Sequence, residues 1–199
     1  MTKGPRYMHL PTFSMREIDN VWFAVLLDRG DEISAITFSP NRKAVLRQIT
    51  RYVPRTFEAK RDDSKGYPAL DVIGKLFNGE AVEQIPKINL TYATGFQQTV
   101  YTMLRKIPRG TVSTYSRLAH AVGCKRGYRA IGRVLASNRH PILIPCHRIV
   151  YSSLDVGGYS TPGLGERGAR QLKRRILTGE GVRFEDGKVL SNYLFSFEH

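Results

Sequence analysis

Apolar and polar positions alternate along two short runs near the start of the chain. Residues 20–27 are an apolar run of β-forming type, residues 28–31 read Asp-Arg-Gly-Asp, and residues 32–38 alternate again. Alternation with a period of two is typical of a strand that buries one face, and a turn rich in Asp and Gly between two such runs indicates a hairpin. The pattern therefore predicts two antiparallel strands here.

The rest of the first half predicts short elements separated by turn residues. Pro40-Asn41 opens a helix that runs to about Tyr52, and Pro54 ends it because proline disfavours a helical conformation in the residue before it. The charged residues that follow, 55–66, predict an exposed loop. A second short helix, stopped by Asn78-Gly79, and a further strand are expected at residues 68–77 and 87–92.

The spacing of apolar residues becomes helical from Thr94 onward. Thr94 is a helix-capping residue, and the apolar residues after it recur at intervals that place them on one helix face, as far as the break at Pro108-Arg109-Gly110. The residues of that face are Phe96, Val100, Leu104 and Ile107.

Two short helices are expected next, joined by a tight basic turn. Ser113 or Thr114 caps the first helix, and Gly123 ends it. The turn Cys124-Lys125-Arg126-Gly127 then leads into a helix from Tyr128 to about Ser137. This pattern predicts a helix-turn-helix, although ordinary helical bundles contain similar pairs. The chain as a whole predicts a mixed α/β (α+β) fold with two domains, at residues 1–92 and 93–199.

Composition and net charge indicate the class of molecule that the chain binds. The chain of 199 residues is 41% hydrophobic, which is enough for a core and excludes wholesale disorder. No apolar run is long enough to cross a membrane, and the first residues lack a signal-peptide pattern, so a cytoplasmic protein (nuclear in a eukaryote) is expected. The net charge of +14 favours nucleic acid as the partner, with generic basicity as the alternative.

Cysteine usage points to a single unusual segment. The two cysteines, Cys124 and Cys146, form neither a disulfide framework nor a CxxC pair, so we expect no metal and no cofactor. Residues 138–150 place Cys146 after a proline and before His147, between apolar residues. A thiolate is a nucleophile, and a neighbouring histidine that is oriented by a carboxylate could activate it if the backbone turns at Pro145. From these residues alone, a nucleophilic Cys146 and an inert buried thiol both remain open.

The same segment resembles a known family. The residues Ile-Pro-Cys-His-Arg-Ile-Val, with Asn138 and Pro141 before them, resemble the active-site signature of the O6-alkylguanine-DNA alkyltransferases. Residues 111–119 and 129–132 are similar to the two helices of that family's helix-turn-helix, residues 156–160 to its pocket loop, and residues 176–181 to its C-terminal Leu-x-x-x-Glu stretch. The N-terminal half resembles the family's RNase H-like domain in architecture only.

The resemblance implies a function. The chain is expected to repair DNA by moving an alkyl group from O6 of guanine, and less well from O4 of thymine, onto its own cysteine, once and irreversibly. By similarity, Cys146 is the acceptor, His147 is a base that acts through a water, and Glu180 orients His147. Tyr115 donates a proton to N3 of the base, and Asn138 stabilises the turn that presents the cysteine.

The resemblance also implies how substrate and DNA are held. The carbonyls of Cys146 and Ile149 accept from the guanine amino group, while Ser160 and the Tyr159 amide face O6. Double-stranded DNA is expected to bind through its minor groove to a monomer, with the lesion flipped out and Arg129 filling the vacated stack. Further DNA contacts are expected from Tyr115, Ser116, Gln97, Lys125, Arg126, Arg133 and Ser152.

Each assignment has a plainer alternative. Tyr115 could be a core aromatic, Arg129 a phosphate contact only, and Glu180 a solvated charge at a helix end, while Cys124 is expected to be a bystander. The zinc site that some relatives carry in the N-terminal domain is not expected, because no cysteine precedes Cys124. A lesion-binding protein without an acceptor and a transcription regulator are the competing functions. Residues 183–199 receive no function from the sequence.

Overall fold

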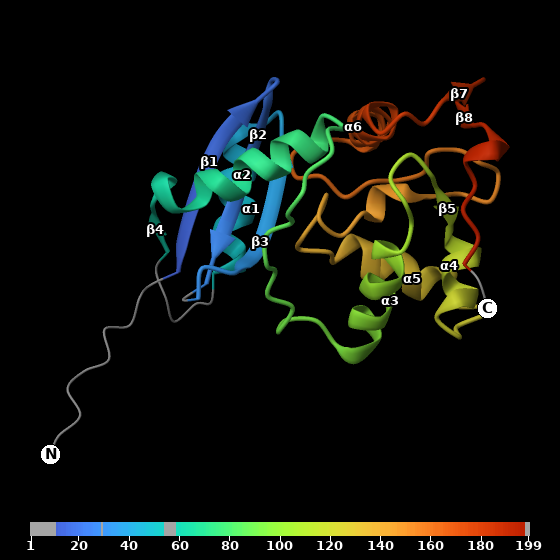
Figure 1. Cartoon of the computed structure of the whole chain (residues 1–199), viewed down its shortest axis with the longest axis horizontal. Helices are drawn as coiled ribbons and strands as arrows, with labels where there is room; N and C mark the ends of the chain where they lie inside the picture. Colours follow the sequence, from blue (N-terminus) through green and yellow to red (C-terminus); the bar gives the residue numbers. More distant parts are fainter. Residues whose placement is uncertain (1–10, 29, 54–58, 198–199) are drawn as a thin grey trace, which may run out of the picture.

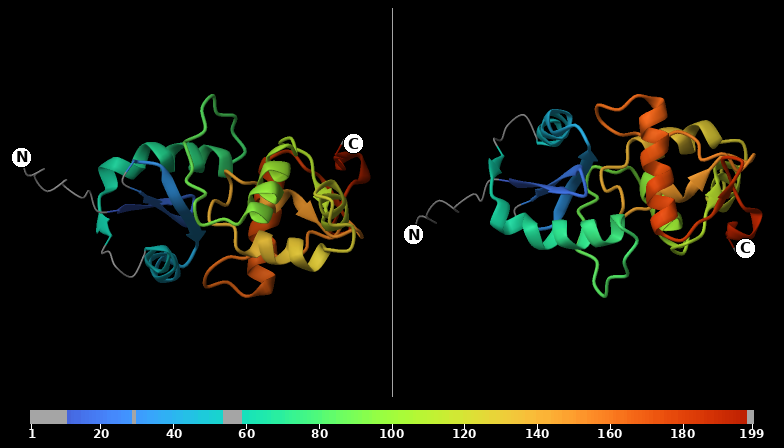
Figure 2. Two further views of the ribbon diagram at one scale, coloured as in Figure 1. Left: turned by 90° about the horizontal axis from the view of Figure 1, so that it is seen from below. Right: turned by 90° about the horizontal axis from the view of Figure 1, so that it is seen from above.

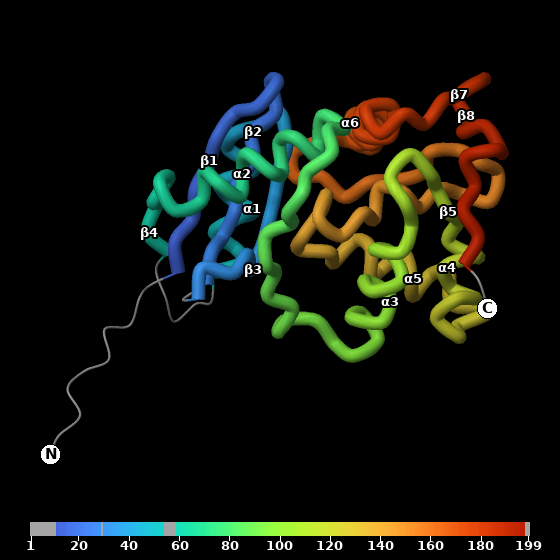
Figure 3. The backbone as a smooth tube through the Cα atoms, viewed as in Figure 1, coloured from blue at the N-terminus to red at the C-terminus, as the bar shows by residue number. Residues whose placement is uncertain are grey.

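The computed structural model describes residues 11–28, 30–53 and 59–197. Two units lie side by side in it, a sheet with its helices in the N-terminal half and a mainly helical unit in the C-terminal half (Figure 1). The tube view shows that the chain passes between them through an extended segment ahead of α3 (Figure 3). No helix in the described part of the chain is long and apolar enough to span a membrane.

The N-terminal sheet has four strands in the order β3-β2-β1-β4. The predicted hairpin is confirmed as β2 (Val21–Leu27) and β3 (Ile33–Ser39), which pair antiparallel. β1 (Thr12–Ile18) pairs antiparallel with β2, and the two-residue β4 (Lys60–Arg61) pairs parallel with β1. The sequence prediction missed β1, in which three of the seven residues are buried. β2 and a helix of the same half pack against it.

Two helices cover opposite faces of this sheet, as both views of Figure 2 show. Alternating residues of β2 point to opposite sides, so that each face has its own apolar cluster. Ala24 and Leu26 belong to the cluster of α1 (Arg42–Tyr52), and Phe23 and Val25 to that of α2 (Asp63–Phe77). The expected helix from Asn41 is confirmed, since the Asn41 side chain caps α1 by accepting from the Ala44 amide.

Two sequence predictions in this half are wrong. Residues 63–66, expected in an exposed loop, form the first turn of α2, and Pro68 lies inside that helix. Pro68 is the sixth residue of α2, so it removes the hydrogen bond that an amide there would donate to the carbonyl of Ser64. The strand expected at residues 87–92 is reduced to a single parallel bridge between Ile33 and Ile88. Residues 54–58 of the expected loop lie outside the described residues.

The C-terminal half confirms the predicted helices. Thr94 caps α3 (Gly95–Arg105) in a reciprocal capping box with Gln97, and Thr114 caps α4 (Tyr115–Ala121). A turn ending at Gly127 leads to α5 (Tyr128–Ala136). Phe96 departs from the expected apolar face: it is 39% exposed, whereas the other residues named for that face are buried.

Short elements complete this half. β5 (Ser113–Thr114) pairs parallel with β6 (Ile149–Val150), which follows the 3₁₀ turn η1 (Cys146–Arg148). α6 (Glu166–Gly179) precedes the small hairpin of β7 (Phe184–Glu185) and β8 (Lys188–Val189) and the 3₁₀ turn η2 (Ser191–Tyr193). The chain then runs beside Val112. The Val112 amide donates to the Tyr193 carbonyl, and the Phe195 amide donates to the Val112 carbonyl.

The two halves meet in an apolar cluster and in a close backbone contact. Leu143, Leu172 and Ile176 pack in the same cluster as Phe23 and Phe77 of the sheet unit, so α6 joins the halves. The loop after α2 meets the C-terminal end of α6. A Cβ atom on Gly79 would lie 1.8 Å from the Gly179 carbonyl oxygen, and Gly79 has φ +80°. Both facts require glycine at this position.

This contact predicts the effect of one substitution. Gly79→Ala forces the α2 loop away from α6 and places a Cβ at positive φ, so the free energy of unfolding is expected to fall by about 1–3 kcal/mol. Urea denaturation followed by circular dichroism measures it. Gly95→Ala is the matched control, because nothing lies within 4 Å of a Cβ there. Equal stability of the two variants would contradict a backbone contact between the halves.

Candidate active site

Cys146 lies at the start of a tight turn inside the C-terminal unit. Pro145 has φ −81° and ψ 60°, and η1 begins at the next residue, so the backbone turns where the sequence required it. The cysteine is 7% exposed. Burial raises the pKa of its thiol, while a hydrogen bond from the Asn138 side chain and the charge of Lys173 oppose that rise. The thiol therefore needs a base to become a nucleophile.

Asn138 holds the cysteine and its loop together. Its Nδ2 donates to Sγ of Cys146 at 3.2 Å and to the carbonyl of Ile144 at 3.0 Å, and its Oδ1 accepts from the His140 amide at 2.9 Å. Ile142, within this loop, has φ +75°. That conformation costs a β-branched residue about 1–3 kcal/mol, which the surrounding contacts must offset.

The acceptor loop, residues 138–144, is also fastened to the edge strand of the N-terminal sheet. The Ile36 amide donates to the Arg139 carbonyl at 2.6 Å, and Nε2 of His140 lies 2.7 Å from the Ile33 carbonyl. Burial lowers the pKa of His140 to about 4, so the ring is neutral and its Nε2 carries the donated proton. β3 thus helps to place the cysteine.

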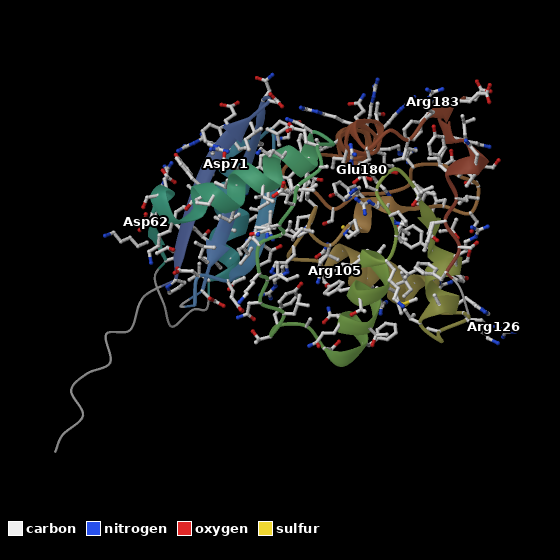
Figure 4. All side chains as sticks on the ribbon, in the orientation of Figure 1. Asp62, Asp71, Arg105, Arg126, Glu180 and Arg183 are labelled. Atoms are coloured by element: carbon white, nitrogen blue, oxygen red, sulfur yellow. The ribbon has the colours of Figure 1, made fainter. Side chains whose placement is uncertain are left out.

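His147 is joined to Glu180 in a buried ionic cluster. Nε2 of His147 lies 2.9 Å from Oε1 of Glu180, and Arg148 donates to both carboxylate oxygens from Nε and Nη2 at 2.7–3.2 Å. Glu180 is the C-cap of α6, and its side chain is 4% exposed, which excludes a solvated charge. Figure 4 shows it within the body of the C-terminal unit, whereas Arg126 points outward at the edge.

Burial keeps His147 neutral, and Glu180 decides which ring nitrogen carries the proton. Burial would raise the pKa of Glu180, but hydrogen bonds and charges from His147 and Arg148 outweigh it and lower the pKa to about 2. Burial lowers the pKa of His147 despite Glu180. An ionised carboxylate and a neutral imidazole place the proton on Nε2 and leave Nδ1 as an acceptor. Nδ1 is buried and has no hydrogen-bond partner among the described residues.

Lys173 is a buried group that the sequence analysis missed. Its Nζ donates to the carbonyl of Ile149 at 2.6 Å and to that of Gly158 at 3.3 Å, and burial lowers its pKa to about 7. It lies on the inward face of α6, between Ala169 and Ile176. Helical spacing to these apolar residues and to Glu180 was the signal that could have found it.

A cavity of about 460 Å³ opens beside Cys146. The expected Tyr115, Asn138, Tyr159 and Ser160 line it, and so do residues of β3 and α1 that the sequence did not predict. Burial raises the pKa of Tyr115 to about 12, which keeps its hydroxyl a proton donor. The N-terminal lining consists of Ile36, Thr37, Phe38, Gln48 and Tyr52.

A second cavity of about 550 Å³ adjoins the first, since Tyr115 and Gly132 line both. Besides Tyr115, three other residues expected to bind DNA line it, namely Ser116, Arg129 and Ser152. Two exposed aromatics that sequence reasoning missed, Tyr128 and Tyr151, line it as well. The Ser116 and Ser152 hydroxyls lie 3.2 Å apart. This cavity is therefore a second space beside the one at Cys146.

The remaining expected DNA contacts lie apart from both cavities. Lys125, Arg126 and Arg133 are exposed on the turn and on α5, while the Gln97 amide is used in its capping box and in a 2.9 Å bond to Ser137. Their roles stay predictions. Among the described residues, no group of three or more His, Cys, Asp or Glu side chains is placed to hold a metal ion.

Comparison with known proteins identifies similar chains. A family model described as "6-O-methylguanine DNA methyltransferase, DNA binding domain" matches residues 95–182. The methylated-DNA–protein-cysteine methyltransferase of Thermococcus sibiricus is 31% identical over 170 residues, which cover 80% of this chain and 89% of that one. The protein of the same name from Candida glabrata is 36% identical over 118 residues, 59% of this chain and 53% of its own length.

Solved structures show the same fold. The O6-methylguanine-DNA methyltransferase of Pyrococcus kodakaraensis aligns with a TM-score of 0.63 and 25% identity, over 87% of this chain and all of that one. The OGT protein of Mycobacterium tuberculosis, solved in complex with DNA, aligns with a TM-score of 0.68 and 24% identity, over 85% and 92% of the two chains. The mixed α/β architecture is thereby confirmed.

The ionic cluster predicts that Glu180→Gln is strongly destabilising. Removing one partner leaves the Arg148 charge buried without compensation, so the free energy of unfolding is expected to fall by about 3–5 kcal/mol in urea denaturation at neutral pH. The pKa of Glu180 in the folded protein lies below its ordinary 4.5, so the wild-type protein should lose this stabilisation as pH falls from 4.5 toward 2. The free energy of unfolding of Glu180→Gln should fall less over the same pH range.

Glu166→Gln is the control for that change. Glu166 pairs with Arg170 on the surface of α6, and its side chain is 79% exposed. Such a pair contributes about 0–1 kcal/mol. A Glu180→Gln variant as stable as Glu166→Gln would mean that the carboxylate is not part of a buried ionic cluster.

Proposed function

The chain belongs to the methylated-DNA–protein-cysteine methyltransferase family, and we propose that Cys146 is the acceptor of the alkyl group that it removes from DNA. The protein is a DNA-repair alkyltransferase that moves a methyl or other alkyl group from O6 of guanine to its own cysteine. The observation that carries the proposal is the buried Cys146 thiol, held by Asn138 at the wall of a cavity and followed by a histidine whose proton position Glu180 fixes.

The transfer is a displacement at the alkyl carbon. The thiol proton passes through a water to Nδ1 of His147, the sulfur forms a bond to the alkyl carbon, and the bond from that carbon to O6 breaks. The electron pair goes to the guanine, which is neutralised by a proton from the Tyr115 hydroxyl at N3. The Tyr115 phenolate then regains a proton from solvent, and His147 releases to solvent the proton that it took from the thiol. The product is an uncharged thioether, so the sulfur is not regenerated and each molecule reacts once.

The cavity supplies groups for recognising the base. The Tyr159 amide and the Ser160 hydroxyl face O6 as its charge develops, and the carbonyls of Cys146 and Ile149 accept from the exocyclic amine. The Ile149 carbonyl already accepts from Lys173, which leaves its second lone pair for the base. Lys173 also donates to the carbonyl of Gly158, so it links β6 to the loop of residues 156–160 and fixes the distance between them.

Access to the lesion requires the base to leave the duplex. We assign α4 and α5 as a helix-turn-helix whose second helix lies in the minor groove, with Arg129 entering the stack as the guanine turns into the cavity. Exposed cations on the turn and on α5, and the second cavity beside Tyr115, support this assignment. The protein acts as a monomer, with residues 1–92 as an RNase H-like domain whose strand order supports that description.

Intact mass tests the acceptor directly. Incubation with a duplex that contains O6-methylguanine should add the mass of one methyl group, and peptide mapping should place it on Cys146. Cys146→Ala is expected to bind the same duplex and gain no mass. Methylation at Cys124 instead, or none on the reduced wild-type protein, would overturn the assignment.

Arg129→Ala separates entry of the base from chemistry. The variant should lose about 10-fold or more in transfer rate on a duplex, because flipping a base costs a few kcal/mol that the arginine offsets. Its reaction with the free base O6-benzylguanine, measured by the same mass assay, is expected to stay near the wild-type rate. Equal losses on both substrates would count against Arg129 as the residue that replaces the flipped base.

A further inference from the structure

Helix α1 carries a stripe of positive charge that the repair reaction described above does not use. Lys43, Arg47 and Arg51 recur every four residues and are all exposed, so they lie along one face of the helix. The helix contains no acidic residue. Among the described residues, none of the three forms an ion pair. Their charges are therefore directed at solvent rather than at the protein.

The stripe lines a groove rather than a convex surface. A cavity of about 320 Å³ is bounded by these three side chains and by Pro162 and Gly163 of the loop before α6. The loop approaches α1 closely: a Cβ on Gly163 would lie 2.6 Å from Cβ of Ala44, and Gly163 has φ +72°. Glycine at this position allows the wall of the groove to form.

The groove continues from the acceptor cavity. Gln48 and Pro162 line both, Gln48 from α1 and Pro162 from the loop that follows Ser160. Figure 2 shows α1, this loop and α5 along the same long side of the molecule, with α2 on the opposite side. A rod-shaped anion that lies along α5 at the mouth of the acceptor cavity therefore extends toward the basic face of α1.

We propose that the groove between α1 and residues 162–163 binds backbone phosphates of the DNA duplex that flank the lesion. The proposal rests on the proposed function, because DNA must already lie across the acceptor cavity. Residues 43 and 51 are separated by about 12 Å along the helix axis, at 1.5 Å per residue. One strand of a duplex places about three to four phosphates in that length. The N-terminal unit is thus part of the DNA-binding surface.

The chemistry of the groove favours a phosphate backbone over a base. Its polar groups are the three cations and the side chains of Asn41 and Gln48, and none of the residues that line it has an aromatic ring on which a base could stack. Contacts of this kind bind any sequence, and their strength depends steeply on salt. That matches a protein whose substrate base can occur in any sequence context.

The test is the salt dependence of DNA binding by a triple variant. Lys43→Ala, Arg47→Ala and Arg51→Ala are combined in a Cys146→Ala background, so that binding to a duplex with O6-methylguanine is measured without transfer. Each phosphate contact contributes about 0.9 to the slope of log affinity against log salt. We expect the slope to become shallower by about 2–3 and Kd to rise at least about 10-fold at low salt.

A second triple variant with the same loss of charge is the control. Lys75, Lys87 and Arg183 are exposed and line none of the cavities described, and Figure 4 shows Arg183 at the outer edge by β7. Replacing these three by alanine should change the slope by less than about 1. If the two triple variants bind with equal slopes and equal Kd, the groove does not bind phosphates and the proposal is wrong.

A measurement of alkyl transfer distinguishes failure of the groove proposal from failure of the proposed function. With Cys146 restored, each triple variant is incubated with O6-benzylguanine, which has no phosphate, and its mass is measured. Transfer by the wild-type protein together with equal slopes for the two variants would reject the groove alone. Failure of wild type to react with either free base or duplex would reject the proposed function instead.

Discussion

The buried carboxylate of Glu180 is the constraint on which the active site depends. A charge removed from water must be paired and hydrogen-bonded, and here the partners come from two residues of one 3₁₀ turn, His147 and Arg148. Glu180 also sits at the C-terminal end of α6, where the helix dipole disfavours a negative charge. The two partners therefore have to be in place for the helix end to pack, which fixes the turn that carries Cys146.

A second constraint acts on the same cysteine from the other side. Asn138 donates to the sulfur of Cys146 and also bonds the loop of residues 138–144. Arg139 and His140 attach that loop to β3. Cys146, the proposed acceptor, is held between the end of α6 and the edge of the N-terminal sheet, so the sheet unit is a structural part of the site.

The sequence predicted several elements whose signals are local. Thr94, Thr114 and Asn41 cap helices as expected, and the β2–β3 hairpin follows the alternation of its residues. β1 pairs with β2 across the two-residue turn Asp19-Asn20, a local signal that the sequence prediction missed. Residues 87–92 form one isolated bridge to β3, at Ile88, rather than a strand. The family motif supplied Cys146, His147 and Glu180. Lys173 and the lining from α1 and β3 needed the tertiary arrangement, since no motif contains them.

The central claim is that burial keeps His147 neutral, while Glu180 holds the remaining ring proton on Nε2 and leaves a free lone pair on Nδ1. The nitrogen-15 spectrum of the histidine side chains at neutral pH tests it most directly, with the His147 signals identified by their loss in His147→Gln. The account predicts one protonated and one bare ring nitrogen, with the protonated one at Nε2. A doubly protonated ring, or a proton on Nδ1, would contradict His147 as the base that activates Cys146.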